Sequence, residues 1–171
     1  MSFGGRLKHS VLESDNPPAV RHETVLHSFT GGFDGQDPQA GVIRDRAGNL
    51  YGTTAYGGQW NGGVVYKVDA KGHETVLYCF TGFADGANPV AGIIRDSAGN
   101  FYGTTSRGTG NKGAAYVLDS AGHLTVLHSF TGGADGGTPY AGVIRSSTGI
   151  LIGTASTGGK QYGGVVFKLK P

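Results

Sequence analysis

The sequence is poor in charge and has no long apolar run. Only 15% of its 171 residues are charged, the formal net charge is +2, and the basic side chains are dispersed along the chain. A nucleic-acid-binding protein ordinarily gathers basic side chains in a stripe that neutralises phosphates. A membrane-spanning helix needs roughly 20 consecutive apolar residues, and no run approaches that length. We therefore expect neither a nucleic-acid partner nor a membrane span.

Cysteine and glutamate are also scarce, with one Cys and three Glu in the chain. Cys79 is alone, so the sequence offers neither an intramolecular disulfide nor a cysteine metal site. With three glutamates in the chain, a glycosidase carboxylate pair would have to come from aspartates in turns. No secretory signal is visible in residues 1–10, and the residues leave the compartment unknown.

Glycine, by contrast, is abundant. The chain holds 33 Gly and 6 Pro, a load that disfavours a helical bundle because each interior glycine destabilises a helix by about 1 kcal/mol. The glycines follow no three-residue period, which excludes collagen. Apolar residues still make up 37% of the chain, with eight Tyr and eight Phe, so we expect a folded core.

An internal repeat determines the expected architecture. The decapeptide His22–Gly31 (HETVLHSFTG) returns at 73–82 and again at 123–132, at offsets of 51 and 50 residues. Three further blocks follow in each unit, and in the first unit they read AGVIRD, GNLYGTT and GVVYKV. We therefore divide one domain into a leader or partial repeat at 1–21 and repeats at 22–72, 73–122 and 123–171.

Each block has the composition of a short strand. The blocks are rich in Val, Ile, Thr, Tyr and Phe and are bounded by Gly, Asp and Asn, as in the turn Asp45–Asn49. Four strands in about 50 residues match the blade of a propeller. The predicted fold class is all-β, a β-propeller-type repeat with three four-stranded antiparallel blades per chain.

The repeat also resembles a known family. The pattern A-G-[VI]-I-R-D-x-A-G-N-[LF]-Y-G-T-T, then G-G-V-V-[YF]-K-[VL] and T-V-L-x-x-F-T-G, is similar to the GloVer tandem repeats of bacterial proteins, from Arg21 to Pro171. The third unit departs from it at Ser146, Ile150 and Ile152. The resemblance implies a propeller-like repeat of extracellular or cell-surface proteins without assigned chemistry.

The order of the strands predicts how a ring could close. If AGVIRD is strand A, GNLYGTT strand B, GVVYKV strand C and ETVLHSF strand D, the chain reads D, ABCD, ABCD, ABC. Closed propellers have about 4–8 blades, so three blades need partners. We expect either a homodimer that closes a six-bladed ring or further repeats of a longer chain.

The D–A and B–C connections of a propeller share one face, the usual binding face. Here these connections are glycine-rich and differ more between units than the strands do. An aromatic ring beside amide and carboxylate groups suits a sugar ring, whereas the alternative is that Trp60 and Tyr162 merely cover neighbouring blades. The candidate ligand-binding residues are Asp34, Tyr56, Trp60, Asn61, Asp85, Arg107, Asn111, Asp135, Tyr140 and Tyr162.

The recurring aspartates of this set, Asp34, Asp85 and Asp135, have two interpretations. They could bind a cation or sugar hydroxyls, but an Asp-Gly step is ordinary turn chemistry, which we favour. The histidines are repeat copies on different blades, and Cys79 occupies the slot of Ser28 and Ser129 without a dedicated base. We assign no catalytic residue, no metal ligand and no cofactor.

The predicted function is a non-catalytic binding or scaffold propeller, with a glycan as the first ligand expected and another protein as the second. Two alternatives stay open. One is a propeller hydrolase or lyase whose carboxylates meet in the central channel. The other is a purely structural surface repeat or a fragment of a longer array.

Overall fold

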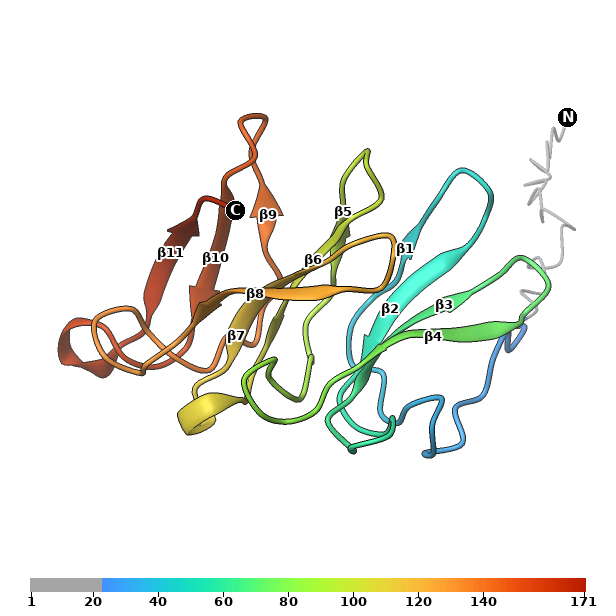
Figure 1. Ribbon diagram of the computed structural model, residues 1–171, viewed down its shortest axis with the longest axis horizontal. Helices are drawn as coiled ribbons and strands as arrows, with labels where there is room; N and C mark the ends of the chain where they lie inside the picture. Colours follow the sequence, from blue (N-terminus) through green and yellow to red (C-terminus); the bar gives the residue numbers. More distant parts are fainter. Residues whose placement is uncertain (1–22) are drawn as a thin grey trace, which may run out of the picture.

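A computed structural model describes residues 23–171, so the leader or partial repeat expected at 1–21 lies outside the described residues. Eleven strands form three antiparallel sheets that stand in an arc (Figure 1). Blade 1 contains β1 (Ile43–Arg44), β2 (Leu50–Thr54), β3 (Val64–Val68) and β4 (Glu74–Cys79); blade 2 contains β5 (Ile94–Arg95), β6 (Phe101–Thr105), β7 (Ala114–Leu118) and β8 (Leu124–Ser129); blade 3 contains β9 (Ile144–Arg145), β10 (Leu151–Ala155) and β11 (Val165–Leu169).

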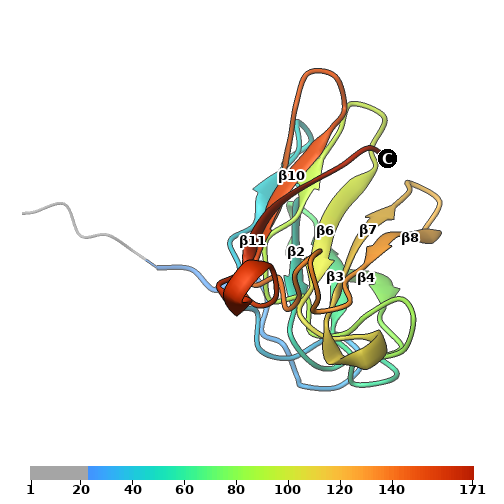
Figure 2. The ribbon, with the colours of Figure 1, turned by 90° about the vertical axis from the view of Figure 1, so that its left-hand side faces the viewer.

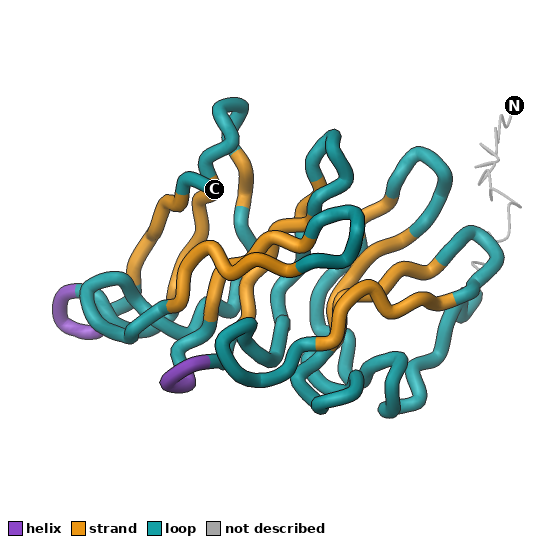
Figure 3. Tube along the Cα trace, in the orientation of Figure 1, coloured by secondary structure: helices purple, strands orange, loops and turns teal. Residues whose placement is uncertain are grey.

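The predicted fold class is confirmed. The sheet orders β1-β2-β3-β4 and β5-β6-β7-β8 are the A-B-C-D meanders expected from the repeats. Two short 3-10 helices, η1 (Thr109–Asn111) and η2 (Lys160–Tyr162), lie in the B–C connections of blades 2 and 3 (Figure 3). No helix in the described part of the chain is long and apolar enough to cross a membrane.

The sheets of blades 1 and 2 each combine two sequence repeats, whereas the three strands of blade 3 all come from the third repeat. Strand β4 comes from the second repeat, yet it pairs with β3 of the first, from Val64 opposite Cys79 to Val68 opposite Glu74. Strand β8 pairs with β7 in the same way. Because the outer strands of blades 1 and 2 are contributed by the following repeat, neighbouring repeats are joined by backbone hydrogen bonds.

Aspartates close the hairpins, as the turn pattern predicted. The Asp45 carboxylate accepts the backbone N–H groups of Ala47 and Asn49, both at 2.9 Å, while Gly48 adopts φ +88°. A side chain at Gly48 would be strained in this left-handed conformation. In blade 3 the Ser146 hydroxyl stands at the position of the Asp45 carboxylate and accepts the Ile150 N–H at 3.0 Å.

Two kinds of contact join adjacent blades. The Thr53 hydroxyl of β2 donates to the Ala91 carbonyl before β5, and the Thr104 hydroxyl of β6 donates to the Ala141 carbonyl before β9, each at 3.0 Å. The apolar contact is a buried cluster, which at the first junction contains Tyr51, Val65, Phe80, Ile93, Phe101, Tyr116 and Leu118. Neighbouring blades therefore share buried apolar clusters, and Figure 2 shows the blades stacked behind one another.

The first expected strand differs from the prediction. Segment 23–29, the strand D that precedes blade 1, takes no part in any ladder, and blade 3 has three strands. A strand is defined by its hydrogen-bonded neighbour, and the described chain places no strand C beside this segment. Its Phe29 ring nevertheless packs edge-on against Tyr66, with centroids 4.9 Å apart, as Phe80 packs against Tyr116 at 5.1 Å.

A glycine opposite an aromatic ring provides a stability test. A Cβ at Gly103 would lie 2.5 Å from the Tyr116 hydroxyl oxygen and 3.0 Å from a methyl carbon of Ile93. We expect Gly103→Ala to destabilise the protein by about 1–3 kcal/mol through overpacking, measured by urea unfolding. Gly163→Ala is the matched control, because a Cβ there meets no atom within 4 Å and its φ is −81°. Equal stability of the two variants would contradict this packing.

Candidate functional site

The D–A and B–C connections come together at one end of each blade. In every blade one residue of each connection pairs in an antiparallel bridge: Gln36 with Tyr56, Ala87 with Arg107, and Gly137 with Thr157. In blade 1 the Gln36 N–H donates to the Tyr56 carbonyl at 2.8 Å, and the Tyr56 N–H donates back at 3.0 Å. We call the surface formed by residues 30–39, 55–62, 81–90, 106–112, 131–140 and 156–163 the loop face; it lies along the lower edge of Figure 1.

The recurring aspartates each hold a D–A connection in a tight turn, which we call a clamp, by accepting hydrogen bonds from the threonine four residues earlier. The Asp34 carboxylate accepts the Thr30 N–H at 2.8 Å and the Thr30 hydroxyl at 2.6 Å. Asp85 and Asp135 accept the N–H and hydroxyl of Thr81 and Thr131 in the same way. Burial alone would raise the pKa of Asp34, but the hydrogen bonds from Thr30 outweigh it and the pKa is lowered. These contacts fit the turn interpretation.

In the second and third units a side chain of strand D adds a further hydrogen-bonding contact to the aspartate. The Tyr78 hydroxyl donates to Asp85 at 3.0 Å, and His128 Nε2 lies 3.0 Å from an Asp135 oxygen. Burial is the main reason why the pKa of Tyr78 rises to about 12. His27 holds the matching place in the first unit, with its Nε2 3.5 Å from Asp34. These histidines support loops rather than converging on a common point.

The asparagines of the predicted set lie at turns. Asn61 adopts φ +55°, and its side-chain oxygen accepts the Gly57 N–H at 2.9 Å, which fixes the B–C connection of blade 1. Asn111 adopts φ +61° in η1, and its backbone N–H donates to the Gly108 carbonyl at 2.8 Å. The side chains of Asn111 and Arg107 are exposed on the loop face. Asn61 thus shapes its loop, whereas Asn111 and Arg107 present polar groups to solvent.

All exposed large aromatic side chains of residues 23–171 lie on the loop face. The predicted aromatics are among them, with Tyr162 83% exposed. Phe33 and Phe83, at 71% and 75% exposure, belong to the same surface and were not singled out by sequence reasoning. Their signal was a large apolar residue one or two positions before the repeated Asp of a glycine-rich loop, where the third unit has Ala134 and Gly133. The full set is Phe33, Tyr56, Trp60, Phe83, Tyr140 and Tyr162.

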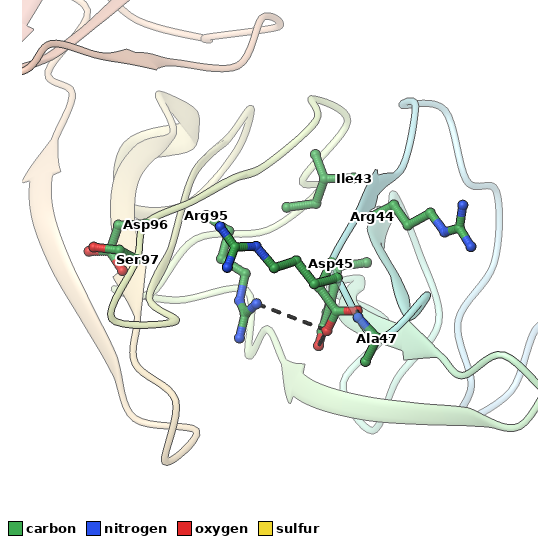
Figure 4. Close-up of a pocket in the computed structure, with 9 residues that line it drawn as sticks. Ile43, Arg44, Asp45, Ala47, Arg95, Asp96 and Ser97 are labelled. Carbon is green, nitrogen blue, oxygen red and sulfur yellow. Dashed lines mark hydrogen bonds and ion pairs between the residues drawn. The ribbon is translucent and has the colours of Figure 1, made fainter.

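An open pocket of about 590 Å³ lies at the opposite end, between the A–B hairpins of blades 1 and 2 (Figure 4). The Arg95 guanidinium reaches from blade 2 to blade 1, where its Nη1 is 4.0 Å from Asp45 and its carbon lies 5.3 Å from the Tyr51 ring centroid. None of the predicted ligand-binding residues lines this pocket. The Arg95 contacts tie two blades together.

The two carboxylates that line this pocket, Asp45 and Asp96, are unsuited to donate a proton, because the pKa of each is lowered. The Asn49 side-chain amide is the main reason why the pKa of Asp45 falls to about 2, and the Tyr51 hydroxyl adds to the effect. A general acid needs a raised pKa near the working pH. Within residues 23–171, no three His, Cys, Asp or Glu side chains are grouped closely enough to hold a metal ion.

Acid should destabilise the fold through these turn aspartates. The pKa is lowered for Asp34, Asp69, Asp96, Asp119 and Asp135 as well as for Asp45. A carboxyl whose pKa is lower in the folded chain stabilises it above the unfolded value of 3.8, and that contribution disappears as the pH falls towards 2.

We therefore expect the Tm from circular dichroism to be flat from pH 7 to about pH 5 and to fall between about pH 4 and pH 2. Asp45→Asn should lower the Tm at pH 7 and make the acid drop smaller, because one titrating clamp is gone. An unchanged Tm at pH 2 would contradict the assignment.

Comparison with protein families gives one match that spans nearly the whole chain. The family model described as the Gloeobacter/Verrucomicrobia repeat matches residues 10–171. Comparison with the curated proteins gives no match.

Among solved structures, the chain is similar to the X-ray structure of a candidate gluconolactonase, at 16% identity and a TM-score of 0.43. The likeness covers 76% of this chain and 47% of that one, so the chain spans about half the length of that structure. A likeness of this degree transfers no activity.

Proposed function

The chain belongs to the Gloeobacter/Verrucomicrobia repeat family, and from that premise we propose that it is a non-catalytic binding module that holds a carbohydrate on its loop face. The observation that carries the proposal is the distribution of exposed aromatics, which are confined to that face. Exposed apolar groups gathered on one surface mark interaction sites.

The loop face has the rigidity that a binding site needs. Its connections are bridged in pairs by backbone hydrogen bonds and fixed by hydrogen bonds to the turn aspartates. Neighbouring blades are joined there too, because the Asn88 N–H donates to the Gly62 carbonyl at 2.8 Å and the Thr138 N–H to the Lys112 carbonyl at 2.7 Å. Aromatic side chains on a preorganised frame lose little conformational freedom when a ligand binds.

The chemistry of the face favours a sugar over an ion. An aromatic ring offers a flat apolar surface with a polar edge, to which the C–H face of a pyranose is complementary. Arg107 and Asn111 supply exposed donors for hydroxyl groups on the same loop face. The aspartates, by contrast, already accept two or three hydrogen bonds from their own loops, which leaves little capacity for a cation.

A glycan array with the intact chain tests the proposal. We expect one class of neutral glycan to bind, and Trp60→Ala or Tyr162→Ala to weaken that binding about tenfold or more through loss of a stacking surface. Lys71→Ala is the control, because Lys71 lies in the β3–β4 hairpin at the other end of blade 1 and should leave affinity unchanged. If no glycan binds, the carbohydrate proposal fails and a protein ligand for the same aromatics becomes the hypothesis to test.

A further inference from the structure

Strand β11 and segment 23–29 both lack the ladder partner that their counterparts have in blades 1 and 2, and we propose that they pair with each other between two copies of this chain. Strand β11 pairs with β10 alone. Segment 23–29 lies beside blade 1 at the far end of the arc from β11 (Figure 1). The proposed partner of each is a second copy, with the exchange made in both directions.

The repeat gives the pairing register. In blade 2, Tyr116 lies opposite Val126, Val117 opposite Thr125 and Leu118 opposite Leu124. Segment 23–29 (ETVLHSF) corresponds to 124–130 (LTVLHSF), and β11 corresponds to β7. Applying the same register places Phe167 opposite Val25, Lys168 opposite Thr24 and Leu169 opposite Glu23 of the second copy.

The open face of blade 1 already has the form of half a blade junction. An open pocket of about 280 Å³ lies there between segment 23–29 and the sheet. Apart from Val25, its lining residues match the positions that form one side of the cluster between blades 1 and 2. Leu26, His27, Phe29, Val42, Leu50, Tyr66 and Val68 of the pocket correspond to Leu77, Tyr78, Phe80, Ile93, Phe101, Tyr116 and Leu118 of the cluster.

The open face of blade 3 carries an exposed apolar side chain that could fill the pocket on blade 1. Val166 of β11 is 77% exposed, whereas the equivalent residues Val65 and Ala115 are fully buried against the next blade. On the receiving side, Val42 is 49% exposed, whereas its equivalents Ile93 and Val143 are each 3% exposed. Val166 and Val42 are thus the two sides of one junction that the chain itself forms twice.

A polar contact is missing at the same place. Thr53 and Thr104 donate across their junctions to Ala91 and Ala141, but the equivalent Thr154 of β10 is exposed. In the proposed assembly Thr154 donates to the Ala40 carbonyl of the second copy. The strand pairing, the apolar insertion and this hydrogen bond each need a blade 1 beside blade 3.

For a ring built only from copies of the described three sheets, the number of blades indicates two copies. Closed propellers have about 4–8 blades, and multiples of three give only six within that range. A ring of two chains with three sheets each is a closed two-fold assembly that gives β11 its missing neighbour and covers both end faces, whereas an open arc leaves this edge exposed and prone to aggregation.

The junction between copies would be more apolar than those within the chain. The third unit has Ser146 and Ile152 where the first has Asp45 and Tyr51, so Arg44 meets no counterpart of the Arg95–Asp45 pair. Screening by salt weakens exposed ion pairs and leaves apolar burial intact. We therefore expect the dimer to persist at high salt.

Light scattering after size exclusion tests the assembly. The intact chain should have a mass of about twice 17.6 kDa across protein concentrations, in low and high salt alike. Val166→Asp should raise the dissociation constant at least about 100-fold by placing an unpaired carboxylate in the junction, and it should leave the single chain folded because Val166 is exposed there. Phe83→Asp, an equally exposed apolar position on the loop face, is the matched control and should remain dimeric.

A wild-type monomer, a polydisperse series of larger species, or a Val166→Asp variant that stays dimeric would overturn the proposal. In the first two cases the edge of β11 would have to be covered by another chain or by further repeats.

A disulfide between copies tests the register itself. With Cys79→Ser as background, Thr24→Cys and Lys168→Cys in one chain should form a covalent dimer on mild oxidation, because residues directly opposite in an antiparallel pair have Cα atoms about 4.5–5.5 Å apart. The control Thr24→Cys with Lys160→Cys moves the second thiol to η2 on the loop face and should not cross-link. Equal cross-linking in both pairs, or bonds only within one chain, would exclude this strand exchange.

Discussion

The pairing between strands C and D is the constraint on which the rest of the structure depends. It joins a strand of one repeat to the first strand of the next, as β3 is joined to β4 and β7 to β8. The phenylalanine that ends each strand D then packs on the aromatic residue of the following blade, as Phe80 does on Tyr116. One ladder therefore fixes both the width of a sheet and the position of its neighbour, so that no repeat can complete its core alone.

The exposed apolar residues divide into two chemically distinct groups. The aromatic ones lie on the loop face, where they are surrounded by glycine and polar residues. The aliphatic ones, Val25, Leu26, Val42, Ile144 and Val166, lie on the two end faces of the arc, at positions that are less exposed in the other blades. Aliphatic side chains suit interdigitated packing between sheets, whereas isolated rings on stiff loops suit a ligand with a flat apolar face. The two surfaces can thus serve assembly and binding without competing.

The aspartates stabilise the turns that connect the strands. Asp45 holds an A–B hairpin, Asp69 a C–D hairpin and Asp34 a D–A connection, each by accepting backbone N–H groups nearby. Repetition of one carboxylate at one turn looks like a repeated binding site in sequence, but a turn needs the same acceptor at the same spacing. Only the hydrogen-bond partners distinguish the two roles, and partners such as Thr30 become visible in three dimensions.

The sequence by itself determined the repeat, the strand order within a blade and the turns that separate the strands, because these depend on local periodicity and on residues such as Gly48 and Asp45 that act on their own neighbours. It also located most of the loop face, although Phe33 and Phe83 were missed because neither recurs at one position of the repeat. Only the tertiary structure decided that segment 23–29 forms no ladder and that Val42 and Val166 are exposed, because pairing and burial depend on which blade stands next to a residue. A repeat specifies the same strand three times, but its neighbours in space differ at the two ends of the arc.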